Sequence, residues 1–216
     1  RFHHVYKHDE KIDLSFIIDC YDDFIHAYVN VSVSNERPQG HHDYLASEDA
    51  IVIQVNGLAN LQDLVAHYRH KDWWTRPHFD HDLTTLPKRT QSLLWKDNGD
   101  YYQLLPIVND AFKSEMKGSN QGFNIALSSY DGGRTQAETL AFVLAKDNNP
   151  FHLSKKITKR VLELTGKSRT ISERRYPEQL DYLGWCSWDA FYQDVNQEGI
   201  INKVKELKDK QIPVKW

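Results

Sequence analysis

Apolar and polar residues alternate along much of the first 147 residues of the chain. The clearest case has an aliphatic or small residue at every second position, namely Ile25, Ala27, Val29, Val31 and Val33. A period of two is the pattern of a β-strand with one buried face. The alternation recurs at 51–55 and 123–127, and these runs stop at the turn signals Asn56-Gly57 and Asp131-Gly132-Gly133.

The strongest turn signal lies between two further strand-like segments. Asp97-Asn98-Gly99-Asp100 separates residues 90–96 from 101–108, and Asn-Gly favours a tight hairpin. Eight or more short strands with regular turns predict an antiparallel β-sandwich over residues 1–147. One segment, 58–70, has apolar residues at helical spacing, so we expect a short helix there.

The pattern changes after residue 147. Pro150 suits the first turn of a helix, apolar residues follow at helical spacing, and Gly166 suits the position after its last turn. Residues 167–178 are polar and resemble a linker. We therefore assign 148–180 as a connecting helix and linker.

Residues 181–216 have the order strand, helix, strand. The segments 181–186 and 212–216 are short apolar runs, and 196–210 is amphipathic, with Ile200, Ile201, Val204 and Leu207 on one face. This order is typical of parallel α/β architectures, which bind ligands at the carboxyl ends of their strands. The predicted fold is therefore mainly β with an α/β tail.

Composition narrows the functional classes. The chain is 40% hydrophobic and 26% charged with a net charge of −3, which is ordinary for a globular protein. There is no apolar run of ~20 residues and no basic patch, so we expect neither a membrane nor a nucleic acid as partner. Cys20 and Cys186 are expected to be reduced, buried thiols, although one long-range disulfide is the alternative.

The two ends bear on location and completeness. No basic and apolar leader is present, which together with the thiols favours a cytoplasmic location. The chain begins at Arg1 and ends at Trp216 within an apparent strand. We therefore expect it to be a piece of a longer protein.

One aromatic stretch carries a family resemblance. Gly184-Trp185-Cys186-Ser187-Trp188-Asp189-Ala190-Phe191-Tyr192 resembles the opening of the catalytic barrel in raffinose synthase-like enzymes, which are related to the α-galactosidases of glycoside hydrolase family 36. Trp73-Trp74-Thr75-Arg76-Pro77 and the segments 90–94, 103–106 and 149–151 are similar to family segments in the same order. The resemblance runs from about residue 70 to the end, and earlier residues match only in their β character.

The resemblance implies an N-terminal β-sandwich followed by a (β/α)8 barrel, of which 181–216 would be the incomplete start. It also implies retaining cleavage or transfer of terminal α-galactosyl groups by two Asp. In the family both carboxylates lie on later barrel strands, so no residue of this chain is assigned as catalytic. We expect the chain alone to be inactive.

Trp188 and Asp189 are the first candidate substrate-binding residues. A flat indole can cover the C–H face of a sugar ring, and by the resemblance Trp188 would form a wall of the galactose subsite. Asp189 could accept hydrogen bonds from sugar hydroxyls. The alternatives are a core Trp and an acid tied to a backbone N–H or to Arg.

Trp73 and Trp74 are the second candidates. Adjacent strand residues face opposite ways, so only one of the two can point at the core. The other would lie at the rim of the substrate site or in an interface with another domain or subunit. Nearby, 78–82 holds four potential metal ligands that a strand would not make converge, so we expect a solvated turn, no metal and no cofactor.

We weigh three functions. The favoured one is a retaining α-galactosidase-like hydrolase acting on α-galactoside oligosaccharides. The alternatives are a galactosyltransferase of the raffinose-synthase type and a non-catalytic β-sandwich that binds carbohydrate or forms an oligomer. A homo-oligomer remains open in each case.

Overall fold

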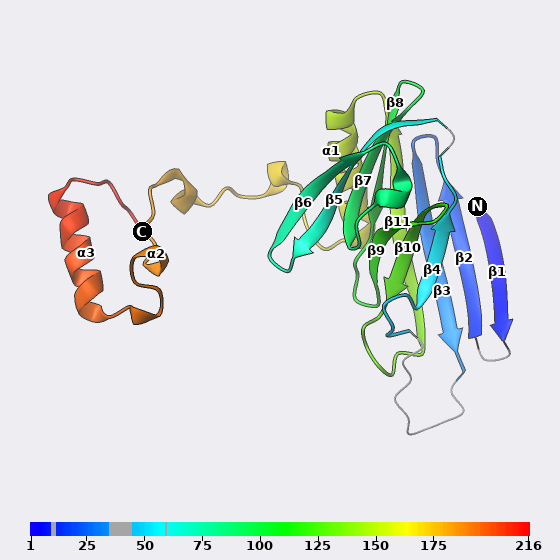
Figure 1. Cartoon of the computed structure of the whole chain (residues 1–216), viewed down its shortest axis with the longest axis horizontal. Helices are drawn as coiled ribbons and strands as arrows, with labels where there is room; N and C mark the ends of the chain where they lie inside the picture. The colour runs from blue at the N-terminus through cyan, green and yellow to red at the C-terminus, as the bar shows by residue number, and fades with distance from the viewer. Residues whose placement is uncertain (10–11, 35–44, 59) are drawn as a thin grey trace. The chain divides into compact units, whose positions relative to one another are not determined.

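The computed structural model describes residues 1–9, 12–34, 45–58 and 60–216 (Figure 1). The chain divides into two compact units, Arg1–Ser168 and Arg169–Trp216. The sequence-based division into 1–147, 148–180 and 181–216 stays a prediction.

The first unit is built on β-strands. They are β1 Phe2–Asp9, β2 Ile12–Cys20, β3 Phe24–Val33, β4 Ile51–Val55, β5 Leu61–Lys71, β6 Trp74–Asp80, β7 Thr90–Asp97, β8 Asp100–Pro106, β9 Lys113–Ser119, β10 Gly122–Ser128 and β11 Gln136–Asp147. A short 3-10 helix, η1, spans Leu83–Thr85, and helix α1 spans Pro150–Thr165.

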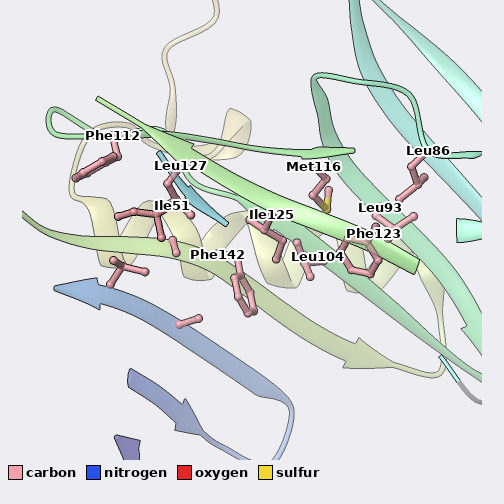
Figure 2. Packing of buried hydrophobic residues seen from close by; sticks show 14 of the residues in the cluster. Ile51, Leu86, Leu93, Leu104, Phe112, Met116, Phe123, Ile125, Leu127 and Phe142 are labelled. Carbon is pink, nitrogen blue, oxygen red and sulfur yellow. The ribbon is translucent and has the colours of Figure 1, made fainter. Parts of the chain in front are cut away.

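These strands form one antiparallel sheet that curls on itself (Figure 1). The strand order is β1-β2-β3-β11-β8-β7-β9-β10-β4, with β5 beside β7 and β6 beside β5. Buried residues from distant places in that order, such as Val29 of β3 and Ile125 of β10, belong to a single core cluster, part of which is shown in Figure 2. The mainly β, antiparallel prediction is confirmed, and the two layers of the expected sandwich are parts of one continuous sheet.

Two local predictions in this unit are confirmed. Asn98 and Gly99 both have positive φ, 48° and 90°, as a two-residue hairpin turn between β7 and β8 requires. Beside the turn, the rings of Trp95 and Tyr102 stack 5.4 Å apart. Gly166 ends α1 with φ of 65°.

Helix α1 is held at its start and along one face. The side chain of Asn149 accepts hydrogen bonds from the backbone N–H groups of Phe151 and His152, and Pro150 occupies the first turn. Leu153 and Ile157 are fully buried in a second core cluster that includes residues of β8 and β11. Burying side chains of this size stabilises the contact by about 1.5–3 kcal/mol each.

The helix expected at 58–70 is wrong, because this segment contains β5. Leu64 and Ala66 are buried, whereas Val65 between them is only partly buried and His67 after them is exposed, which is the alternation of a strand. β5 pairs with β6 on one side and β7 on the other. Leu64, Ala66 and Tyr68 fit this alternation, so the apolar spacing is compatible with a strand as well as a helix, and pairing on both edges decides the outcome.

The second unit contains α3, Gln197–Asp209, a short helix α2, Trp188–Phe191, and the 3-10 turns Ile171–Glu173, Glu178–Asp181 and Tyr192–Asp194. The strand expected at 181–186 is reduced to one parallel bridge between Leu183 and Val214, on either side of α3 in sequence. Residues 169–216 contain no strand, so the predicted strands at 181–186 and 212–216 are wrong, and only α3 and this single parallel bridge remain of the predicted order. Two parallel segments without further neighbouring strands share few hydrogen bonds. This explains why the bridge does not extend into a ladder.

Candidate substrate-binding site

Trp188 begins helix α2 and presents its ring outward. Its side chain is 58% exposed within the second unit, and its ring meets that of Tyr192 edge to face at 5.7 Å. The backbone carbonyl of Ser187 accepts hydrogen bonds from the N–H groups of Ala190 and Phe191, which fixes this turn. An indole face is thus left open beside a phenol.

The neighbouring aromatic residues Trp185 and Phe191 pack against each other. The rings of Trp185 and Phe191 meet edge to face at 6.4 Å. Phe191 also lies against Gly199, where an added Cβ would come within 2.9 Å of the Phe191 ring. Trp185 is half-buried, so it acts mainly in packing.

The side chain of Tyr192 is exposed. Its backbone has φ 47° and ψ −122°, a conformation that residues other than glycine rarely adopt. Such a conformation costs on the order of 1–3 kcal/mol, and residues of this kind cluster at functional sites. Tyr192 therefore joins Trp188 as a candidate residue.

Asp189 is exposed in the first turn of α2. Among the described residues its carboxylate has no recorded hydrogen bond or ion pair, so the alternative of an acid tied to a backbone N–H or to Arg is not seen there. Both oxygens of Asp189 are therefore available to accept hydrogen bonds from a ligand.

Close backbone packing holds the stretch before α2. A Cβ added at Gly184 would lie 2.8 Å from three atoms of the Trp216 ring. The indole N–H of Trp216 donates a hydrogen bond to the backbone carbonyl of Gln179 at 2.6 Å. The backbone N–H of Trp185 donates to the backbone carbonyl of Trp216 at 2.9 Å. Only glycine fits at position 184 without displacing this ring.

Trp73 and Trp74 lie where the chain turns from β5 to β6, in the first unit. Trp73 is 77% exposed and Trp74 43%, so neither is a core residue. The ring of Trp74 stacks on His70 at 5.6 Å, and the guanidinium of Arg76 lies 5.4 Å from its centre. Trp73 meets Trp74 only edge to face, at 6.5 Å. The open indole of the pair is therefore Trp73.

The neighbours of Trp74 were not identified from the sequence. His70 lies on β5, which the sequence pattern had assigned to a helix, so no cross-strand partner could be inferred. Partial burial lowers the pKa of His70, and the positive charges of Arg76 and Lys71 lower it further. His70 is therefore neutral where it stacks on Trp74.

The His and Asp residues at 78–82 organise a turn. Asp80 accepts hydrogen bonds from the N–H groups of His81 and Asp82 and from the hydroxyl of Thr85. These bonds, led by the one from His81, hold the pKa of Asp80 below its usual value. Across the described residues, no three His, Cys, Asp or Glu side chains group as they would around a metal ion.

Two further sequence expectations concern the thiols and the membrane. Cys20 and Cys186 are free, as expected, but both are exposed, so the prediction of buried thiols is wrong. Cys20 ends β2, and Cys186 lies in a unit without a buried side chain. None of the described helices is long and apolar enough to cross a membrane.

The four candidate residues named from the sequence belong to different units. Trp188 and Asp189 belong to the second unit, together with Tyr192, whereas Trp73 and Trp74 belong to the first. The structure therefore defines the local geometry within each unit.

Comparison with known proteins places the chain in a family. Residues 37–216 match the family described as raffinose synthase or seed imbibition protein Sip1, and this segment includes all four candidate residues. The chain belongs to the raffinose synthase family, which confirms the resemblance of the aromatic stretch.

Three relatives illustrate the relationship. The chain is 30% identical to galactinol–sucrose galactosyltransferase of Pisum sativum over 155 residues, 68% of this chain and 19% of the relative. It is 26% identical to probable galactinol–sucrose galactosyltransferase 5 of Arabidopsis thaliana over 202 residues, 87% and 24% respectively. It is 29% identical to stachyose synthase of Pisum sativum over 159 residues, 70% and 18%. The chain thus spans about a fifth of the length of these relatives.

Proposed function

We propose that the protein transfers a galactosyl group from a donor such as galactinol to a sugar acceptor such as sucrose. The observation that carries this proposal is the family match across 37–216, together with relatives named as galactosyltransferases. These names favour the transferase alternative over the hydrolase that we preferred from the sequence. Hydrolysis of the same galactosyl bond is the second candidate, since it differs only in having water as the acceptor.

In this proposal Trp188 is one wall of the galactose subsite. Its indole is exposed and held at the start of α2, with Tyr192 at its edge. A sugar C–H face placed on the indole would cover about 80 Å² of apolar surface, which at ~25 cal/mol per Å² contributes about 2 kcal/mol. Asp189, the next residue, would accept hydrogen bonds from the sugar hydroxyls.

Trp73, on the first unit, is also proposed as a contact for the sugar substrate. It is the more exposed of the two indoles at the β5–β6 turn, whereas Trp74 already carries His70 and Arg76 on its ring. An interface with another domain or with a second copy of the chain is the competing role for this surface. No residue of 1–216 is proposed as the nucleophile or the acid/base.

We also propose that 1–147 is a sandwich domain and that 181–216 begins the catalytic barrel. The parallel bridge between Leu183 and Val214 across α3 supports the second assignment, since parallel strands joined by a helix are the repeating unit of such a barrel. A cytoplasmic location is proposed on the free, exposed thiols.

The test uses the protein expressed at the full length of its reading frame. It is incubated with galactinol, with and without sucrose, and the products are separated by chromatography. Transfer predicts a galactosylated sucrose as the main product when sucrose is present. Release of free galactose at the same rate with and without sucrose would support the hydrolase instead. Absence of turnover, with retained sugar binding, would support a non-catalytic module.

A further inference from the structure

A buried histidine lies beneath helix α1. His26, on β3, is only 1% exposed, and its Nε2 lies 3.2 Å from Nε of Arg160 on α1. A guanidinium only donates hydrogen bonds, so Nε2 of His26 must accept this one. The contact therefore exists only while the imidazole is neutral and carries its proton on Nδ1.

The surroundings hold Arg160 over this histidine. Its guanidinium lies 5.8 Å from the ring centres of both Tyr21 and Phe24, and the Tyr21 ring is 4.8 Å from that of His26. Glu163, three residues further along α1, lies 3.5 Å from Arg160. Arg160 is therefore fixed by two aromatic faces, one carboxylate and the imidazole.

The charged groups on the neighbouring strands offset a charge on His26 only in part. Asp19 of β2 is directly opposite His26, but its carboxylate is bound by Arg1 at 2.7 and 2.8 Å. On the other side, β11 places Val143 opposite His26. Tyr28, two residues along β3, has a raised pKa, mainly because it is partly buried, and is neutral.

Protonation of His26 would therefore be unfavourable in this structure. The acceptor at Nε2 would become a donor facing a guanidinium at 3.2 Å. Burial lowers the pKa of His26 from 6.5, the charge of Arg160 lowers it further, and Asp19 opposes these effects without reversing them. The contact is complete above pH 6.5 and is lost as the pH falls through the lowered pKa.

We propose that the contact between His26 and Arg160 is an acid-sensitive latch that releases the C-terminal half of α1 from the sheet. The N-terminal half has other anchors, since Leu153 and Ile157 are fully buried and Nδ1 of His152 lies 2.8 Å from Asp147. In the C-terminal half, Val161 and Leu164 are only partly buried against the same cluster. Acid therefore loosens the end of α1 that leads into residues 167–178.

The strand side of the latch lies outside the family match, whereas Arg160 lies within it. His26, Tyr21 and Phe24 all precede residue 37, where the match to the family begins. The proposal does not depend on the proposed galactosyl transfer, and its test measures no activity.

The first measurement needs no variant. The imidazole of His26 is titrated by NMR in the protein at the full length of its reading frame. The latch predicts a midpoint below 6.5. A midpoint at or above 6.5 would overturn it.

The second measurement follows backbone hydrogen exchange in residues 158–165 at pH 7.5 and 5.0, corrected for intrinsic exchange and compared with β7 and β8. The latch predicts that exchange accelerates at pH 5.0, by up to roughly tenfold for each unit by which the pKa of His26 lies below 6.5. His26→Gln can still accept from Arg160 without titrating, so it should abolish the acceleration. The control His67→Gln, at an exposed position of β5, should retain it. Equal acceleration in the wild type and in His26→Gln would also overturn the proposal.

Discussion

Replacing Trp188 by Ala separates a substrate contact from a packing residue. The indole is more than half exposed, and its recorded ring contact is with Tyr192. Its removal should therefore change the free energy of unfolding by less than about 1 kcal/mol, since little of it is buried. The sugar face that it covers is worth about 2 kcal/mol, which corresponds to roughly a thirtyfold loss of binding.

The assay is steady-state kinetics of the full-length protein with galactinol as donor and sucrose as acceptor. We expect Trp188→Ala to lower kcat/KM for the donor about thirtyfold, while Trp188→Phe retains most of it. The matched control is Trp185→Ala, three residues earlier, whose ring packs on Phe191. That variant should lose stability while its folded fraction keeps the donor KM. Wild-type kinetics in Trp188→Ala would refute the role given to this indole.

Three further changes test other parts of the structure. Gly184→Ala should free the C-terminal segment from its bridge and make it more sensitive to limited proteolysis, because the new Cβ meets the ring of Trp216; unchanged cleavage would contradict this packing. Ile157→Ala should lower the free energy of unfolding by about 2–5 kcal/mol in denaturant titrations, whereas Phe151→Ala on the exposed side of α1 should change it by less than about 0.5 kcal/mol. Trp73→Ala should raise KM for the sugar acceptor more than Trp74→Ala does, and equal KM values in the two variants would favour an interface role for this surface.

Local chemistry made some elements predictable from the sequence. The Asn98-Gly99 turn and the capped helix α1 depend on residues adjacent in the chain, so their signals are complete in the sequence. In β5 the signal was ambiguous, because its apolar spacing fits both a helix and a strand. The pairing with β6 and β7 that decides between them comes from residues distant along the chain.

The candidate site was predicted only in part, because only some of its features depend on residues adjacent in the chain. The aromatic stretch identified the family and the open indole of Trp188, but not the exposure of Tyr192, which follows from an unusual backbone conformation. His26 occupies a polar position in the alternation of β3, which suggests a solvent-facing residue. It is buried because α1, more than 120 residues later in the sequence, covers that face of the sheet.

The central claim, galactosyl transfer, is tested most directly by how the products partition as the acceptor concentration rises. The full-length protein is given galactinol labelled in its galactosyl group, and labelled galactosyl-sucrose and free galactose are measured over a range of sucrose concentrations. We expect the label to move from free galactose to the galactosylated sugar as the sucrose concentration increases. Label that remains in free galactose at every sucrose concentration would contradict it.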